Sequence, residues 1–97
     1  MPASTPPSRS DASMVYDAAH GQILMFGGLG SGYLSDTWVW DGTGWTQLSP
    51  ASAPPARSDA SLAFDVQHAR VVLMGGTNAS GTLKDTWYWD GSNWTPR

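Results

Sequence analysis

The feature that most constrains this 97-residue chain is an internal duplication. Residues 36–42 read Asp-Thr-Trp-Val-Trp-Asp-Gly, and residues 85–91 read Asp-Thr-Trp-Tyr-Trp-Asp-Gly. The flanks repeat as well, since residues 6–13 match 54–61 and residues 23–28 match 71–76. A period of about 48–49 residues is typical of repeat architectures, in which one structural unit stacks on its copy. We therefore predict a linker segment at 1–8, a first unit at 9–48, a linker at 49–56 and a second unit at 57–97.

Charge and composition exclude several classes of function. The formal net charge is −3, with five Lys and Arg against eight Asp and Glu, so the chain lacks the basic surface of a nucleic-acid binder. No apolar stretch is long enough to span a membrane, and no segment has the pattern of a signal peptide. With no cysteine, disulfides and thiol chemistry are excluded. We expect neither a nucleic-acid nor a membrane partner, and the cellular compartment stays open.

Each unit is predicted to contain four short strands. We place them at 10–16, 22–27 and 36–40 with a short one from Trp45, and at 58–64, 70–75 and 85–89 with a short one from Trp94. The second strand is a near-continuous apolar run, which suits a strand covered on both faces. The third is rich in aromatic and β-branched residues, which fit a packed pleated surface. No segment shows a capped 3.6-residue apolar period, so we expect almost no helix.

Turn residues separate these strands. The pairs Asp41-Gly42 and Asp90-Gly91 predict hairpins between the third and fourth strands. Gly21 is expected to supply a positive φ in the turn before the second strand. Ala69 replaces that glycine in the second unit, so we expect strain or a different shape there. The second unit has one extra residue between Gly76 and Leu83, which predicts a loop.

Four antiparallel strands per unit, covered on both faces and repeated in tandem, describe the blade of a β-propeller. The chain resembles two kelch repeats of the bacterial type. The resemblance is carried by the glycine doublets 27–28 and 75–76 and by six tryptophans: Trp38, Trp40, Trp45, Trp87, Trp89 and Trp94. It implies an all-β fold with two four-stranded antiparallel blades. The glycines are expected to let a neighbouring backbone or aromatic ring approach closely. Asp11-Ala12 and Asp59-Ala60 stand where many kelch repeats have Gly-His.

Two blades are fewer than the six or seven that usually close a kelch propeller, and they leave apolar faces uncovered. Such faces mark association surfaces. We therefore predict a homo-oligomer in which copies join head-to-tail, with three chains giving six blades or four giving eight. If residues 94–97 of one copy continue into 1–9 of the next, they match the linker 45–57 in length. This match leads us to expect an engineered or excised module.

Two sets of residues are candidate sites. Arg9, Asp11, Arg57 and Asp59 lie at the start of each first strand, which lines the channel of a propeller. A ring of alternating Arg and Asp could bind an anion, a cation or water, and we favour a structural ring of ion pairs and hydrogen bonds. The second set lies in the loop where the two repeats differ most: Tyr33, Asn78 and Lys84 are the candidates for binding a partner. We expect a tolerated variable loop there more than a site.

The remaining polar residues suggest scaffold roles. His20 and His68 are expected to be solvated, and Asp17 and Asp65 to accept backbone hydrogen bonds in their turns. The aspartates that flank the third strand are interpreted as turn and capping residues: Asp36, Asp41, Asp85 and Asp90. They recur in both repeats, whereas a catalytic site needs an asymmetric constellation.

No catalytic residue, metal site or cofactor is therefore predicted. The copper oxidase built on kelch blades depends on a cysteine-linked tyrosine, which a cysteine-free chain cannot form. We expect a non-catalytic structural scaffold. The alternative is a module that binds a protein or a carbohydrate, in which exposed tryptophans could stack on sugar rings.

Overall fold

The structure is a computed structural model, and it describes residues 6–97. Within these residues the protein is all-β with no helix, as the sequence predicts. The expected continuation of one copy into residues 1–9 of the next, which matches 45–57, includes Pro2, Ala3 and Ser4, and these three lie outside the described residues. The strands are β1 (Ser13–Asp17), β2 (Gln22–Leu29), β3 (Tyr33–Trp40), β4 (Trp45–Leu48), β5 (Ser61–Asp65), β6 (Arg70–Met74), β7 (Thr77–Asn78), β8 (Gly81–Thr82), β9 (Thr86–Trp89) and β10 (Trp94–Pro96).

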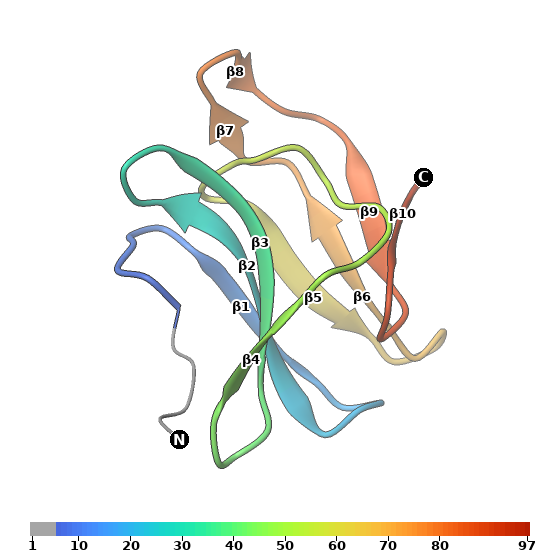
Figure 1. Ribbon diagram of the computed structural model, residues 1–97. Helices are drawn as coiled ribbons and strands as arrows, with labels where there is room; N and C mark the ends of the chain where they lie inside the picture. Colours follow the sequence, from blue (N-terminus) through green and yellow to red (C-terminus); the bar gives the residue numbers. More distant parts are fainter. Residues whose placement is uncertain (1–5) are drawn as a thin grey trace.

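The strands form two four-stranded antiparallel sheets, each from one continuous stretch of chain (Figure 1). The N-sheet has the order β1-β2-β3-β4 and the C-sheet the order β5-β6-β9-β10. The register repeats as well, because Leu24 pairs with Val39 in the N-sheet and Val72 pairs with Tyr88 in the C-sheet. The two sequence repeats are therefore two copies of one meander. In the described part of the chain no helix is long and apolar enough to cross a membrane.

Aspartate side chains shape the outer hairpins. Asp41 Oδ1 accepts hydrogen bonds from the backbone N–H groups of Thr43 and Gly44 at 2.9 and 3.0 Å. Asp90 Oδ1 does the same for Ser92 and Asn93. These backbone N–H donors, which favour the charged carboxylate, lower the pKa values of Asp41 and Asp90. The hairpins predicted from the Asp-Gly pairs are present.

The β1–β2 and β5–β6 turns share one conformation despite a sequence difference. Gly21 has φ +63° and Ala69 has φ +54°. The left-handed region disfavours any residue with a Cβ atom. The C-sheet turn therefore keeps the shape set by its repeat, and of the two predicted outcomes, strain or a different shape, the strained one occurs.

The structure corrects three predicted boundaries. The first strands begin at Ser13 and Ser61, because Asp11 and Asp59 interrupt them with φ values of +57° and +59°. Upstream of the interruption only isolated bridges form, from Ser10 to Leu29 of β2 and from Ser58 to Thr77 of β7. In the N-sheet β2 and β3 extend past the glycine doublet, and in the C-sheet residues 77–82 form the β7–β8 ribbon. The segment predicted as a loop is therefore mostly hydrogen-bonded hairpin in both repeats.

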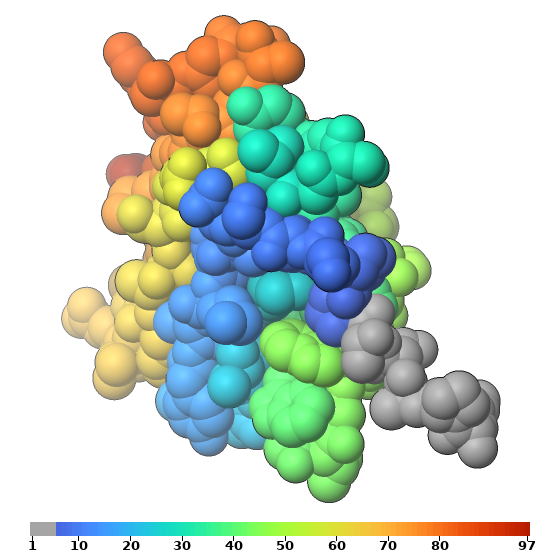
Figure 2. Space-filling view, turned by 90° about the vertical axis from the view of Figure 1, so that its left-hand side faces the viewer, coloured from blue at the N-terminus to red at the C-terminus, as the bar shows by residue number. Residues whose placement is uncertain are grey.

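The hydrophobic core lies between the two sheets. The buried core residues are Leu24, Phe26 and Val39 from the N-sheet and Val71, Leu73, Trp89 and Trp94 from the C-sheet. Strand β1 contacts β5 and β6, and Figure 2 shows residues of β1 (blue) beside those of β5 (yellow). Because side chains alternate along a strand, each sheet gives one face to this core and turns the other face away. We call these the inner and outer faces.

Candidate functional site

Among the described residues, the contact between the two sheets combines a buried core with specific hydrogen bonds, and we take it as the candidate site. Its centre is Trp94 of β10, which is 1% exposed. The Trp94 indole N–H donates to Thr37 Oγ1 of the N-sheet at 3.0 Å. Its ring meets Phe26 edge-on, with centroids 5.3 Å apart. A buried donor that has an acceptor avoids the penalty of an unpaired polar group, so this hydrogen bond fixes the position at which the two sheets dock.

Backbone hydrogen bonds add a second set of contacts at the start of the C-sheet. The Arg57 N–H donates to the Leu34 carbonyl at 3.1 Å, and the Gly28 N–H donates to the Arg57 carbonyl at 2.8 Å. Nearby, Ser13 Oγ donates to the Ala60 carbonyl at 2.5 Å. The segment before β5 therefore binds the N-sheet much as an extra strand would.

The Arg57 side chain turns back into its own sheet. Its guanidinium forms a bidentate pair with Asp85 at 2.6 and 2.8 Å and also donates to the Gly75 carbonyl at 2.8 Å. The side chain is fully buried. The hydrogen bonds from Arg57, with a further one from the Trp87 indole, lower the pKa of Asp85 to about 2. Arg57 thus joins three segments through its backbone and its side chain.

The N-sheet holds the same ion pair. Arg9 binds Asp36 at 2.5 and 2.7 Å and donates to the Gly27 carbonyl at 3.0 Å. Burial raises the pKa of Asp36, but the hydrogen bonds from Arg9 and Trp38 outweigh it, so the pKa is lowered. Asp36 and its equivalent Asp85 were predicted as turn and capping residues. They are instead the partners of the two arginines. Asp36 lies in β3 and Asp85 directly precedes β9, and at these positions the carboxylates contact the guanidinium groups.

The predicted channel residues are therefore not brought together as alternating Arg–Asp pairs. Arg9 and Arg57 pair with Asp36 and Asp85, and Asp11 and Asp59 are exposed at left-handed positions. Only a backbone hydrogen bond joins the last two, from the Asp59 N–H to the Asp11 carbonyl at 3.1 Å. One signal could have found the pairs: Asp36 follows Arg9 by 27 residues, and Asp85 follows the equivalent Arg57 by 28.

The glycine doublets permit a close backbone approach, as the sequence predicts. A Cβ atom at Gly27 would lie 2.6 Å from the carbonyl oxygen of Arg57, which belongs to the following sheet. At the equivalent Gly75 the nearest atom to such a Cβ is 3.6 Å away and belongs to Leu83 of the same sheet. The first glycine of the doublet therefore makes room for the arginine segment of a following sheet. In this chain the N-sheet has such a neighbour and the C-sheet does not.

The two outer faces carry the repeat equivalents of residues that are buried between the sheets. On the N-sheet, Met14 and Tyr16 are 59% and 58% exposed, whereas their equivalents Leu62 and Phe64 pack against the core. On the C-sheet, Met74 is 50% exposed and its equivalent Phe26 only 1%. The difference in burial within each pair depends on the presence of a neighbouring sheet.

The histidines belong to the β1–β2 and β5–β6 turns. His20 Nδ1 lies 2.7 Å from Asp17 Oδ2, and His68 Nδ1 lies 2.8 Å from Asp65 Oδ2. Asp17 Oδ1 and Asp65 Oδ1 also accept a backbone N–H each, as predicted. The histidines are thus held by aspartates, although His20 and His68 side chains are still 38% and 58% exposed. No group of three or more His, Cys, Asp or Glu suited to a metal ion occurs in residues 6–97.

The three predicted loop residues have different surroundings. Tyr33 begins β3 and is 38% exposed, and Lys84 is exposed before β9. The Asn78 side chain is engaged, because its amide donates to the Ala56 carbonyl at 2.9 Å and its oxygen accepts the Ser80 N–H at 2.9 Å. Asn78 therefore holds the β7–β8 ribbon against the linker, a contact that the sequence does not reveal.

Comparison with known proteins adds no relative, since no protein-family model matches the chain and no curated protein matches it.

Proposed function

We propose that this protein is a non-catalytic structural scaffold that self-assembles head-to-tail into a closed β-propeller of kelch blades. Three chains would supply six blades, and four would supply eight. One observation carries the proposal: the chain contains one complete sheet-to-sheet contact, and the sequence repeat places each half of that contact again on an uncovered outer face. The N-sheet outer face of one copy would cover the C-sheet outer face of another.

The repeat supplies the equivalent residues for the new contact. The apolar residues at the centre of the C-sheet outer face are Val72, Met74 and Tyr88, which correspond to Leu24, Phe26 and Val39. On the N-sheet outer face Trp40 and Trp45 correspond to Trp89 and Trp94. By this correspondence, the Trp45 indole of a following copy would donate to Thr86 of the preceding one, as Trp94 donates to Thr37 within the chain.

The backbone contacts have equivalents too. The Arg57 carbonyl accepts from Gly28, so the Arg9 carbonyl of a following copy would accept from Gly76. The open space beside Gly75 would admit that Arg9 segment, as Gly27 admits Arg57. The Arg9 side chain is already in the conformation of Arg57, on Asp36 and Gly27. Much of the ordering cost of the contact is therefore met before association.

The contact is heterologous, since it joins two different faces. Heterologous contacts give a ring when the rotation between neighbours closes and a filament when it does not. In the proposed assembly the rotation between neighbouring chains equals the rotation between the N-sheet and the C-sheet within one chain, so every blade is related to the next by the same rotation. A rotation near one sixth or one eighth of a turn per blade closes the ring with three or four chains.

Native mass spectrometry together with sedimentation tests the proposal. We expect a closed species of three or four chains at micromolar concentration. Met74→Glu would put a charge on the C-sheet outer face, where desolvating it on association is unfavourable, and should give folded monomers. Ser31→Glu adds the same charge at an exposed position of the β2–β3 hairpin and should still assemble. A stable folded monomer formed by the unmodified chain would refute the proposal.

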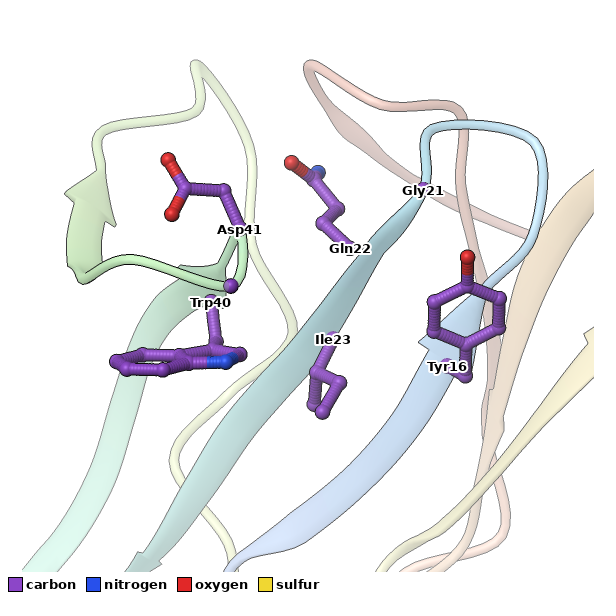
Figure 3. Close-up of a pocket in the computed structure, with 7 residues that line it drawn as sticks. Tyr16, Gly21, Gln22, Ile23, Trp40 and Asp41 are labelled. Carbon is purple, nitrogen blue, oxygen red and sulfur yellow. The ribbon is translucent and has the colours of Figure 1, made fainter.

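A second candidate function, carbohydrate binding, is favoured by one observation. A shallow cavity of about 250 Å³ on the N-sheet is flanked by Tyr16 and Trp40, with Gln22 and Asp41 at its rim (Figure 3). Aromatic faces beside amide and carboxylate groups suit a sugar ring. Binding on a glycan array that is lost in Trp40→Ala would support this function. Loss in Tyr33→Ala or Asn78→Ala would instead place a sugar at the β2–β3 and β7–β8 hairpins.

A further inference from the structure

The cavity on the N-sheet has a filled counterpart in the same chain. The cavity is lined by Tyr16, Gly21, Gln22, Ile23, Trp40, Asp41 and Gly42, which come from β1, β2, β3 and the residues next to them (Figure 3). The equivalent surface of the C-sheet includes Trp89 and Gly91. Trp89 is 0% exposed, whereas Trp40 is only half-buried. Something covers this surface on the C-sheet that is missing on the N-sheet.

The imidazole of His20 supplies this cover at Gly91. A Cβ atom built at Gly91 would lie 2.6 Å from His20 Cε1 and closer still to Nε2, so the ring rests directly on this glycine. At Gly42, the equivalent position beside the cavity, nothing lies within 4 Å of such a Cβ. The β1–β2 turn of the N-sheet therefore reaches over to the β9–β10 turn of the C-sheet and places one imidazole on Gly91.

The residue equivalent to His20 is His68, and it is oriented in the same way. Asp65 holds its Nδ1 at 2.8 Å, as Asp17 holds that of His20 at 2.7 Å. Its side chain is 58% exposed against 38% for His20, and Asp65 is 25% exposed against 1% for Asp17. The turn is thus preformed, because the aspartate holds the ring through Nδ1 while the side chain stays largely exposed. A preformed group loses little side-chain freedom on binding.

We propose that the cavity on the N-sheet is the receptor for His68 of a second copy of this chain. This inference rests on the proposed assembly. It names the contact, between the β5–β6 turn of one copy and the β3–β4 turn of the next, that sets the register of neighbouring chains. The imidazole would lie over Gly42 and beside Trp40, and Asp65 and Asp41 would carry the carboxylates next to it. Gly42 is required because a side chain at that position would occupy the place of the ring.

A double-mutant cycle on the assembly equilibrium tests the inference. His68→Ala should raise the chain concentration at half-assembly about tenfold, the effect of losing one well-packed interface anchor. Tyr16→Ala, in the cavity wall, should raise it as well, and the double variant should show less than the product of the two effects. Gln67→Ala, beside His68 on the same turn, should leave the assembly concentration unchanged. His20→Ala should lower the unfolding midpoint instead.

The outcomes separate this inference from the proposed function. If the chain assembles and His68→Ala assembles equally well, the receptor role is overturned while the assembly stands. If the two effects multiply without coupling, His68 lies elsewhere and the inference fails. If the unmodified chain stays monomeric, both proposals fall. A sugar bound by the assembled protein and lost in Trp40→Ala would overturn the inference, because an occupied receptor has no room for a second ligand.

Discussion

The two sheets of this protein have nearly the same sequence and the same strand register, yet their tryptophans differ in burial. Trp89 and Trp94 are 0% and 1% exposed, whereas Trp40 and Trp45 are half-buried. The pair geometry is nearly the same in the two sheets, with ring centroids 5.3 Å apart in the C-sheet and 5.6 Å in the N-sheet. For these two pairs, the sheet's own strands therefore determine how the rings are arranged, and the neighbouring sheet determines how far they are buried.

Truncating equivalent tryptophans should show this difference most strongly. Trp94→Ala removes a fully buried ring and the hydrogen bond to Thr37, so we expect a loss of about 3–5 kcal/mol in the free energy of unfolding. Trp45→Ala should cost less than about 2 kcal/mol, because its ring is already partly in water. Urea unfolding at a chain concentration where Met74→Glu is monomeric, with both truncations made in that variant, gives the comparison. Equal losses would show that burial by the neighbouring sheet contributes nothing.

The two ion pairs give a smaller contrast. Asp85→Asn should lower the free energy of unfolding by roughly 1–3 kcal/mol, because it leaves the fully buried Arg57 guanidinium without its counter-charge. Asp36→Asn should cost less, since Arg9 is 5% exposed and begins the chain's first repeat. The same urea titration at pH 7 measures both. A larger loss at Asp36 would contradict the central position of Arg57.

Acid should remove the contribution of Asp85. Its pKa of about 2 in the folded protein lies below the ordinary value of 3.8. The ion pair therefore stabilises the fold fully above about pH 4, and this contribution is lost as the pH falls toward 2. Urea midpoints measured from pH 5 to pH 2 should fall less steeply for Asp85→Asn than for the unmodified protein. Parallel curves would show that Asp85 does not titrate with folding.

The smallest effect concerns the β1–β2 and β5–β6 turns. Ala69→Gly should stabilise the protein by about 0.5–1 kcal/mol, because alanine holds φ +54° against its preference and glycine does not. The reverse change, Gly21→Ala, should destabilise it by a similar or larger amount, since the Gly21 turn has the same conformation. Thermal unfolding at neutral pH measures both shifts. An Ala69→Gly variant that melts lower would mean that the turn carries no strain.

The sequence predicts those parts of the fold that local chemistry determines. The period of the repeat, the Asp-Gly hairpins, the glycine doublets and the left-handed turn at Gly21 all follow from residue type and spacing. The first strands were predicted too long because Asp11 and Asp59 adopt positive φ, which few residues other than glycine do. Nothing in their neighbours' sequence marks those two positions as interruptions.

The candidate site was predicted less well, because it depends on contacts between distant segments. The Arg57–Asp85 pair needs β9 to approach the start of β5, and this follows only from the register of the whole sheet. The His20–Gly91 contact joins two hairpins of different sheets and has no local signal. The propeller and its assembly were expected from the resemblance to kelch repeats, and they remain proposals.

Each sheet takes all four of its strands from one uninterrupted stretch of chain. Backbone pairing inside a sheet is therefore complete before any second molecule arrives, and no copy has to lend a strand to another. Association would then join subunits that are already folded. Its rate would depend on chain concentration, whereas the rate of folding would not. Dilution would separate such an assembly without unfolding it, and subunits could exchange freely between rings.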